Sequence, residues 1–227
     1  MAAIYDTIAD RITQGTAALP TTGTVAFWFK PNWIHTDATD HVFMHVRTSG
    51  TQYFVIQKFS DNTVYAGWVN TANYRVNTSV SISNGSWQHM ALTWTNGGAT
   101  TLYKDGAAVG TPTAGLVAFT TSTTRNIGNY DASVADVGLN GQIAHYSVWS
   151  RALTEPQITA LQTKVPAHPD VGSIGTDWIT FVSASTTNLW GGTAASLTGI
   201  TGSTDEPTLI PVPANLLRNR SRALRGR

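Results

Sequence analysis

The chain has 227 residues, of which 41% are hydrophobic and only 12% are charged, and it contains no cysteine. A chain of this length buries a sizeable core without disulfides, and the two glutamates, Glu155 and Glu206, are too few for long amphipathic helices. Composition therefore favours an all-β fold, excludes a helical one, and leaves Ser, Thr, Asn and Gly to supply most of the wetted surface.

The formal net charge of +1 conceals an uneven distribution. Five of the 14 basic residues fall in the last ten positions, which leaves 9 basic against 13 acidic residues, or −4, in the rest of the chain. We therefore expect one domain over 1–213 and a basic tail over 214–227. The start of the chain lacks the basic and apolar regions of a signal peptide, and no stretch is long enough to span a bilayer.

From Val25 onward, short aromatic and β-branched runs alternate with turn residues, which is typical of an antiparallel sandwich. The expected strands cover 24–30, 41–48, 52–59, 63–69, 74–82, 87–95, 100–104, 107–110, 125–129, 141–150 and 178–183. Asp105-Gly106 supplies the two positive φ angles that a tight hairpin turn needs. One short helix is expected near 154–163, with Thr154 and Gln157 placed as in a capping box. The segment 183–204 receives no assignment.

Several blocks of the sequence resemble laminin G-like and concanavalin A-like lectin jelly-roll domains. They are, in the order of the family, Thr24–Pro31, Trp87–Trp94 with Leu102–Gly106, Asn126–Gly128, and Gly141–Leu161. The resemblance covers roughly 24–161 and implies an antiparallel jelly-roll β-sandwich. It does not imply one function, because the family includes glycan-binding lectins, adhesion modules, enzyme appendages and virion proteins.

Enzymatic activity is not expected. The resemblance implies that glycosidases on this sandwich place clustered carboxylates on one strand, since hydrolysis needs two carboxyl groups about 5–10 Å apart. No expected strand carries such a pair, and Asp205-Glu206 precedes Pro207 in a turn-like context. Serine nucleophile elbows, zinc-protease helices and phosphate-binding loops are absent from the sequence as well.

Two polar segments are candidates for a divalent ion. The first, 35–41, holds two imidazoles and two carboxylates but matches no known metal loop, so we interpret it as a polar connection between strands. The second contains Asp131 and Asp136, in a loop where some related domains bind calcium. Ala144 stands where the family often has an acidic residue, which speaks against calcium. We expect no cofactor, with calcium at this loop as the alternative.

Eight Trp and seven Tyr residues raise the question of sugar binding, because aromatic faces stack on pyranose rings. Most of the tryptophans lie within expected strands and are assigned to the core. Four aromatic residues near loops or in unassigned segments are the candidates for glycan contact: Trp33, Tyr74, Tyr130 and Trp190. Packing in the core is the competing interpretation for each of them.

The basic tail is a candidate partner-binding segment. It follows Pro211-Val-Pro213, which favours an extended exit from the domain, and it carries Arg218, Arg220, Arg222, Arg225 and Arg227. These guanidinium groups can pair with carboxylates on neighbouring protein subunits. No aromatic residue is interleaved with them, so we do not expect nucleic acid to be the partner.

Two functions remain open. The first is a structural or interaction protein, such as a capsid decoration or fibre subunit of a phage or virus, joined to its neighbours as a homo- or hetero-oligomer on a virion surface. The alternative is an extracellular carbohydrate-binding lectin or adhesion domain. They differ in where the binding energy lies: in the tail for the first, and in the loop aromatics for the second.

Overall fold

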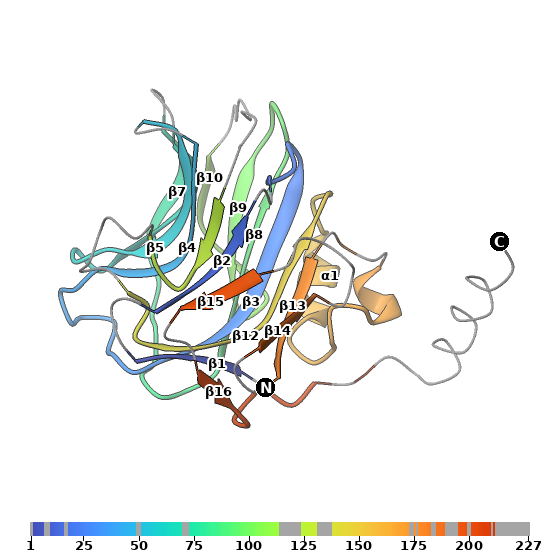
Figure 1. Ribbon diagram of the computed structural model, residues 1–227. Coiled ribbons are helices and arrows are strands. Elements are labelled where there is room, and N and C mark those ends of the chain that lie inside the picture. Colours follow the sequence, from blue (N-terminus) through green and yellow to red (C-terminus); the bar gives the residue numbers. More distant parts are fainter. Residues whose placement is uncertain are drawn as a thin grey trace, which may run out of the picture.

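The structure is a computed structural model that describes residues 2–6, 10–15, 18–48, 51–69, 73–113, 124–130, 138–172, 175, 177–182, 185–188, 195–198, 201–209 and 211. Two antiparallel β-sheets pack face to face, with the short helix on the outside (Figure 1). The fold predicted from the sequence, an all-β antiparallel sandwich with one short helix, is confirmed.

The first sheet, sheet A, has β12 at its centre. Its strands are β1 (Ala2–Tyr5), β3 (Gly23–Pro31), β8 (Gln88–Trp94), β9 (Thr100–Lys104), β10 (Ala107–Thr113), β12 (Gly141–Trp149), β13 (Asp177–Val182), β14 (Ser185–Asn188) and β16 (Thr201–Ser203). The main path runs β10-β9-β8-β3-β12-β1-β16, and β13 and β14 extend the sheet from β12. Strand β12 thus pairs with β3 on one side, and with β1 and β13 on the other.

The second sheet, sheet B, closes the sandwich. Its strands are β2 (Arg11–Gly15), β4 (His41–Arg47), β5 (Tyr53–Lys58), β6 (Thr63–Val69), β7 (Asn73–Ser79), β11 (Thr124–Ile127) and β15 (Ala195–Thr198). They lie in the order β15-β2-β11-β4-β5-β6-β7. The core between the two sheets is aromatic: the rings of Trp68 and Trp94 meet edge to face at 6.1 Å, and Phe54 lies 5.2 Å from Trp68.

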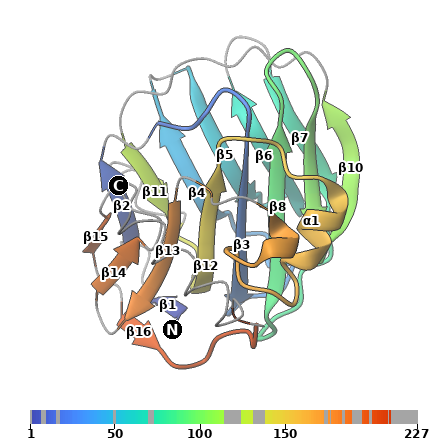
Figure 2. The same cartoon turned by 90° about the vertical axis from the view of Figure 1, so that its right-hand side faces the viewer.

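A second, smaller core lies outside sheet A. Helix α1 (Glu155–Ala160) and the 3₁₀ turn η1 (Pro169–Val171) cover part of the outer face of this sheet (Figure 2). Ile158 and Leu161 pack there with Trp149 and Val171. The expected cap is present, because the backbone N–H of Thr154 donates to Oε1 of Gln157 over 3.0 Å.

Each of the strands expected from the sequence matches an observed strand, β3 through β13, and the Asp105-Gly106 turn has φ angles of 47° and 79° as required. Five observed strands are not among those expected from the sequence: β1, β2, β14, β15 and β16. Strand β1 reads Ala-Ala-Ile-Tyr and is almost wholly buried, so it lacks the polar alternation that marks a strand.

The segment 183–204 has no assignment from the sequence, and its described parts extend both sheets. Strand β15 pairs with β2 at the edge of sheet B, and β16 pairs with β1 at the edge of sheet A. Residues 214–227 lie outside the described part of the chain, so the division into domain and tail stays a prediction. No helix within the described residues is long and apolar enough to cross a membrane.

Candidate functional site

The outer surface of sheet B carries a row of polar and aromatic side chains. Phe54 and Ile56 of β5 point into the core, so Tyr53 and Gln57 point outward. The same alternation turns His45 of β4 outward. We call the following residues the sheet B face: His45, Tyr53, Gln57, Tyr65, Asn126 and Tyr130.

Register aligns these residues across neighbouring strands. Asn126 of β11 lies opposite His45 of β4, and Gln57 of β5 lies opposite Tyr65 of β6. Thr13 of β2 continues the first row, and its hydroxyl donates to Oδ1 of Asn126 over 3.0 Å. The sheet B face therefore spans four strands, β11, β4, β5 and β6.

Three half-buried tyrosines, Tyr53, Tyr65 and Tyr130, stand on this face, and two of them pack against a buried histidine. The ring of His45, which is 4% exposed, meets Tyr130 edge to face with 4.5 Å between centroids. It also lies 5.6 Å from the ring of Tyr53. Tyr65 packs against Phe59 at 4.3 Å. The tyrosine rings are thus held by packing while part of each remains accessible to a ligand.

A chain of hydrogen bonds orients Tyr130. Its hydroxyl donates to Oε1 of Gln57, whose Nε2 donates to Oδ2 of Asp40 over 3.0 Å. The other carboxylate oxygen of Asp40 accepts from the backbone N–H of Ser60 over 2.7 Å. Because Gln57 is fully buried and bonded at both ends, it fixes the position of the Tyr130 hydroxyl. That oxygen can still accept a hydrogen bond from a ligand.

Beside this chain, the connection before β4 forms a buried charged cluster. Nζ of Lys58 donates to Oδ1 of Asp37 and, over 2.9 Å, to the carbonyl of Thr39. Nε2 of His41 lies 2.6 Å from Oδ2 of Asp37. Partial burial opposes ionisation of Asp37, but the hydrogen bonds from Lys58 and His41 outweigh it and lower the pKa of this carboxyl. The cluster holds the connection in place.

Trp33 belongs to the packing of this region. Its ring is 5% exposed and is stacked on His41 with 4.0 Å between centroids. Its Nε1 donates to the carbonyl of Leu139 over 2.6 Å, and Nζ of Lys58 lies 5.7 Å from the ring. For Trp33 the structure thus favours the core interpretation over contact with a glycan.

The other predicted site residues have different positions. Tyr130 lies on the sheet B face. Tyr74 lies on β7 opposite Trp68, and its side chain is not among the described parts. The remainder of the predicted set falls outside the described residues: Trp190, Asp131, Asp136, Arg218, Arg220, Arg222, Arg225 and Arg227. Sequence reasoning missed Tyr53, Tyr65, His45 and Gln57, although the alternation in Tyr-Phe-Val-Ile-Gln marks Tyr53 and Gln57 as sharing one face.

The described residues offer no ready calcium site. No group of three His, Asp or Glu side chains gathers among them as a metal centre requires. Asp37 and Asp40, in the connection before β4, already accept hydrogen bonds on both carboxylate oxygens. This agrees with a polar connection over 35–41, while calcium at Asp131 and Asp136 stays a prediction.

The model of the concanavalin A-like lectin/glucanases superfamily matches residues 6–159. Among curated proteins, the rat (Rattus norvegicus) sushi, von Willebrand factor type A, EGF and pentraxin domain-containing protein 1 is 26% identical in an alignment of 181 residues that covers 72% of this chain. The chain spans only 5% of that protein's length.

Two solved structures share the fold. One is a protein from Bacteroides ovatus ATCC 8483 to which carbohydrate binding is ascribed, with a TM-score of 0.60, 17% identity, and coverage of 89% of this chain and 62% of that chain. The other is the heptameric SAP-like pentraxin of Limulus polyphemus, with a TM-score of 0.53, 17% identity, and coverage of 87% and 95%. At 17% identity, these similarities show a shared fold and nothing more.

Proposed function

Because the chain belongs to the concanavalin A-like lectin/glucanase superfamily, we propose that it is a non-catalytic carbohydrate-binding domain whose glycan lies on the sheet B face. The observation that carries this proposal is the set of half-buried tyrosines, Tyr53, Tyr65 and Tyr130, around buried polar side chains. The carbohydrate binding ascribed to the Bacteroides ovatus protein of similar fold supports it. An extracellular setting suits such a domain.

The chemistry of the sheet B face suits a sugar. Tyrosine rings present flat apolar surfaces to the C–H faces of a pyranose, and their hydroxyl groups bond its hydroxyls. The His45 imidazole packs against the rings of both Tyr53 and Tyr130. The amides of Gln57 and Asn126 are buried beside the tyrosines, and their hydrogen bonds to protein partners hold the site in one arrangement. A preorganised site loses less entropy when it binds.

The absence of catalysis is part of the same proposal. Hydrolysis of a glycosidic bond needs two carboxyl groups that face the sugar. Among the described residues, Asp40 is the carboxylate bonded to this face, and Gln57 and Ser60 occupy its oxygens. Asp37 bonds Lys58 and His41 instead. Neither carboxylate is placed to protonate a leaving group or to attack an anomeric carbon.

Glycan-array binding followed by titration calorimetry tests this function. Tyr53→Ala and Tyr130→Ala should each weaken binding of the selected glycan about tenfold, since each removes one stacking surface. Trp87→Ala is the matched control, because Trp87 is a partly exposed aromatic residue next to β8 of sheet A and its loss should leave the affinity unchanged. If both tyrosine variants bind like the wild type, the glycan does not lie on the sheet B face.

The virion function expected first from the sequence has less support. It depends on the arginine tail, which lies outside the described residues, and neither the rat protein nor the two solved structures above are described as virion proteins. Attachment to neighbouring subunits through this tail remains a separate proposal, compatible with glycan binding on the sandwich.

A further inference from the structure

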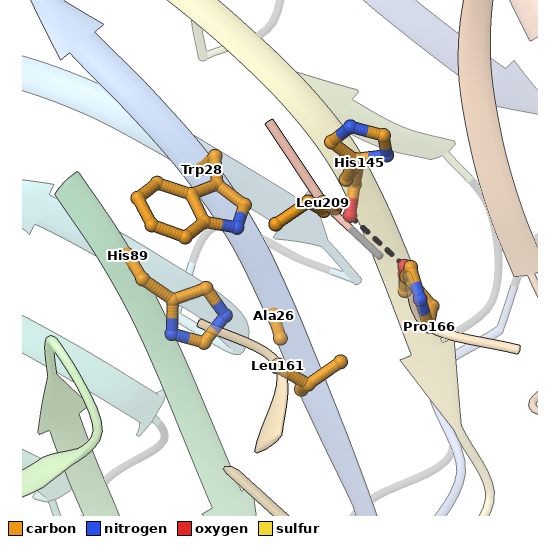
Figure 3. Close-up of a pocket in the computed structure, with 8 residues that line it drawn as sticks. Ala26, Trp28, His89, His145, Leu161, Pro166 and Leu209 are labelled. Carbon is orange, nitrogen blue, oxygen red and sulfur yellow. Dashed lines mark hydrogen bonds between the residues drawn. The ribbon is translucent and has the colours of Figure 1, made fainter. Parts of the chain in front are cut away.

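The outer surface of sheet A, opposite the proposed glycan site, contains a small hollow (Figure 3). Trp28 of β3, His89 of β8 and His145 of β12 line it from the sheet, and Leu161 and Leu209 line it from above. It encloses about 170 Å³ including its opening to solvent. The hollow therefore brings two histidines and a tryptophan together beneath two separate segments of chain.

One of the covering segments is the chain after β16, residues 204–209, which we call the strap. It continues from β16 along the bottom of the view in Figure 2. Asp205 accepts from Nζ of Lys30 over 2.5 Å and from Nε1 of Trp87 over 3.1 Å. Beyond these contacts, Glu206 lies 3.8 Å from Nε2 of His145, and Leu209 reaches the hollow. A few polar contacts, most of them solvent-exposed, and one leucine thus hold the strap.

The two histidines beneath are placed to be neutral. His89 is 2% exposed, and its Nδ1, like that of His145, is buried with no hydrogen-bond partner among the described residues. Nε1 of Trp28 is likewise buried without a partner there, and the rings of Trp28 and His89 meet at 5.4 Å. A protonated imidazole would bury an N–H donor that nothing in the described structure accepts.

His145 also occupies a special backbone position. Its φ is 51°, in the left-handed region that residues other than glycine seldom adopt. The pairing of β12 with β3 shifts register between Ala144 and Ser147, so that two residues of β12 stand opposite one of β3. This is a β-bulge, which re-aims a side chain within a strand. The bulge places His145 at the hollow.

Charged groups facing the histidines only partly favour protonation. Near His89, Asp105 favours the charged imidazole and Lys104 disfavours it. Near His145, Glu206 favours the charged imidazole and the positive N-terminal amino group disfavours it. The segments packed above contribute the apolar residues Leu161, Pro166 and Leu209. Burial outweighs the carboxylates and lowers the pKa of each histidine from 6.5 to about 4.

We propose that the strap is an acid-released cover: protonation of His145, and with it His89, frees residues 204–209 from sheet A and exposes the aromatic surface formed by Trp28 and Trp87. The proposal is independent of the glycan site, which lies on the other sheet. The bulge places His145 at the hollow, the hollow buries both histidines, and the strap covers them.

The sign of the effect follows from proton linkage. With the strap released, the imidazoles return to water and to an ordinary pKa of 6.5, so the open form binds more protons than the covered form between pH 6.5 and about 4. Opening therefore increases as the pH falls through this window. At pH 5 the increase is about 30-fold for each histidine that opening returns to water.

Acid at pH 5 does not itself weaken the Asp205 contacts of the covered form. Hydrogen bonds from Lys30 and Trp87 lower the pKa of Asp205 below its ordinary 3.8, so this carboxylate is still ionised at pH 5. Opening at pH 5 is then driven by protonation of the histidines and not by protonation of Asp205.

A single introduced thiol tests the proposal in the full chain, because the protein has no cysteine of its own. Ser147→Cys places a thiol in the wall of the hollow, and Ala66→Cys places one in the core of sheet B as a matched report of global unfolding. The rate at which a disulfide reagent labels each cysteine is divided by its rate with an unstructured thiol peptide at the same pH. This removes the effect of pH on the thiol itself. From pH 7 to pH 5, the Ser147→Cys variant should label at least about tenfold faster, and the Ala66→Cys variant should not change.

Further variants assign the effect to the histidines. In the Ser147→Cys background, His145→Gln should reduce the rise by the factor of about 20 that one histidine contributes between pH 7 and pH 5, while His168→Gln, outside the hollow, should leave it intact. Glu206→Gln should enlarge the rise because His145 loses its counter-charge. Asp205→Asn should speed labelling at both pH values. Equal normalised rates at pH 7 and pH 5, or a full rise in His145→Gln, would overturn the proposal.

Discussion

The buried ion pair between Lys58 and Asp37 is the residue-scale feature on which the proposed glycan site depends. Lys58 has no exposed side-chain surface, and Asp37 is 19% exposed. Two charges this far from water are tolerated because each has a partner and further hydrogen bonds. The pair ties the end of β5 to the connection before β4, which also carries Asp40 of the Tyr130 hydrogen-bond chain.

Removing one member of this pair should be costly. Lys58→Met leaves Asp37 and the carbonyl of Thr39 without their buried donor, and we expect a loss of about 3 kcal/mol in the free energy of unfolding, measured by urea denaturation at pH 7. The double variant Lys58→Met/Asp37→Asn should recover part of this loss because no unpaired charge remains. A single variant within about 0.5 kcal/mol of the wild type would show that the pair is not holding the connection.

The same pair predicts a pH dependence. The folded pKa of Asp37 lies below its ordinary value of 3.8, so its contribution to stability is complete above pH 3.8 and is lost as the pH falls through the folded pKa. The stability difference between the wild type and Lys58→Met, measured by urea denaturation across this pH range, should therefore narrow in acid.

Single residues were the hardest features to predict from the sequence. Trp33 lies between two expected strands and was a plausible exposed ring, yet its Nε1 finds a carbonyl acceptor at Leu139, 106 positions away. The spacing of residues along the sequence cannot reveal a hydrogen-bond partner that lies this far away in the chain. Tyr53 and Gln57 were recognisable as neighbours on one face, but only the packing of the second sheet decides which face is outside.

At the scale of elements, the turn that ends β11 leaves no room for a side chain. Gly128 has a φ of +85°, and a Cβ on it would lie 1.9 Å from Cε1 of Tyr5 on β1. Its N–H donates to the carbonyl of Phe43, and its own carbonyl accepts from Leu139. Glycine at this position lets the chain leave sheet B directly against β1.

Gly128→Ala should therefore destabilise the protein strongly. Gly85 supplies the matched control, since its φ is +69° but a Cβ on it would have no other atom within 4 Å. Gly85→Ala should cost about 1 kcal/mol for the backbone alone, whereas Gly128→Ala should exceed about 3 kcal/mol because Tyr5 must also move. Equal losses in the two variants, measured by thermal or urea denaturation, would contradict this account of the turn.

Strands and the helix could be predicted where the sequence has a regular local pattern. The strands from β3 to β13 have alternating or β-branched runs bounded by turn residues, and α1 has its capping pair at Thr154 and Gln157. The edge strands β14, β15 and β16 have three or four residues each, rich in Ser, Thr and Gly. Their pairing is decided by strands distant in the chain, such as β2 for β15, and not by their own composition.

At the scale of the whole molecule, the two outer faces of the sandwich have different chemistry. Sheet B presents tyrosines that are held by packing and partly accessible. Sheet A is covered in part by α1 (Figure 2), and Leu161, together with Leu209 of the strap, lines the hollow with Trp28, His89 and His145. The core between the sheets and the smaller core under α1 hold the sandwich together. The sheet B face can therefore stay in one arrangement for a ligand while the strap on sheet A responds to pH.

The most direct test of the glycan site is a map of where the sugar binds. Amide chemical shifts of the ¹⁵N-labelled protein would be followed while the glycan chosen by array is added. The account predicts that the largest changes fall on β4, β5 and β6 around His45, Tyr53 and Tyr65, and that Tyr130→Ala reduces them. Changes confined to sheet A, or spread evenly over the molecule, would contradict a glycan site on the sheet B face.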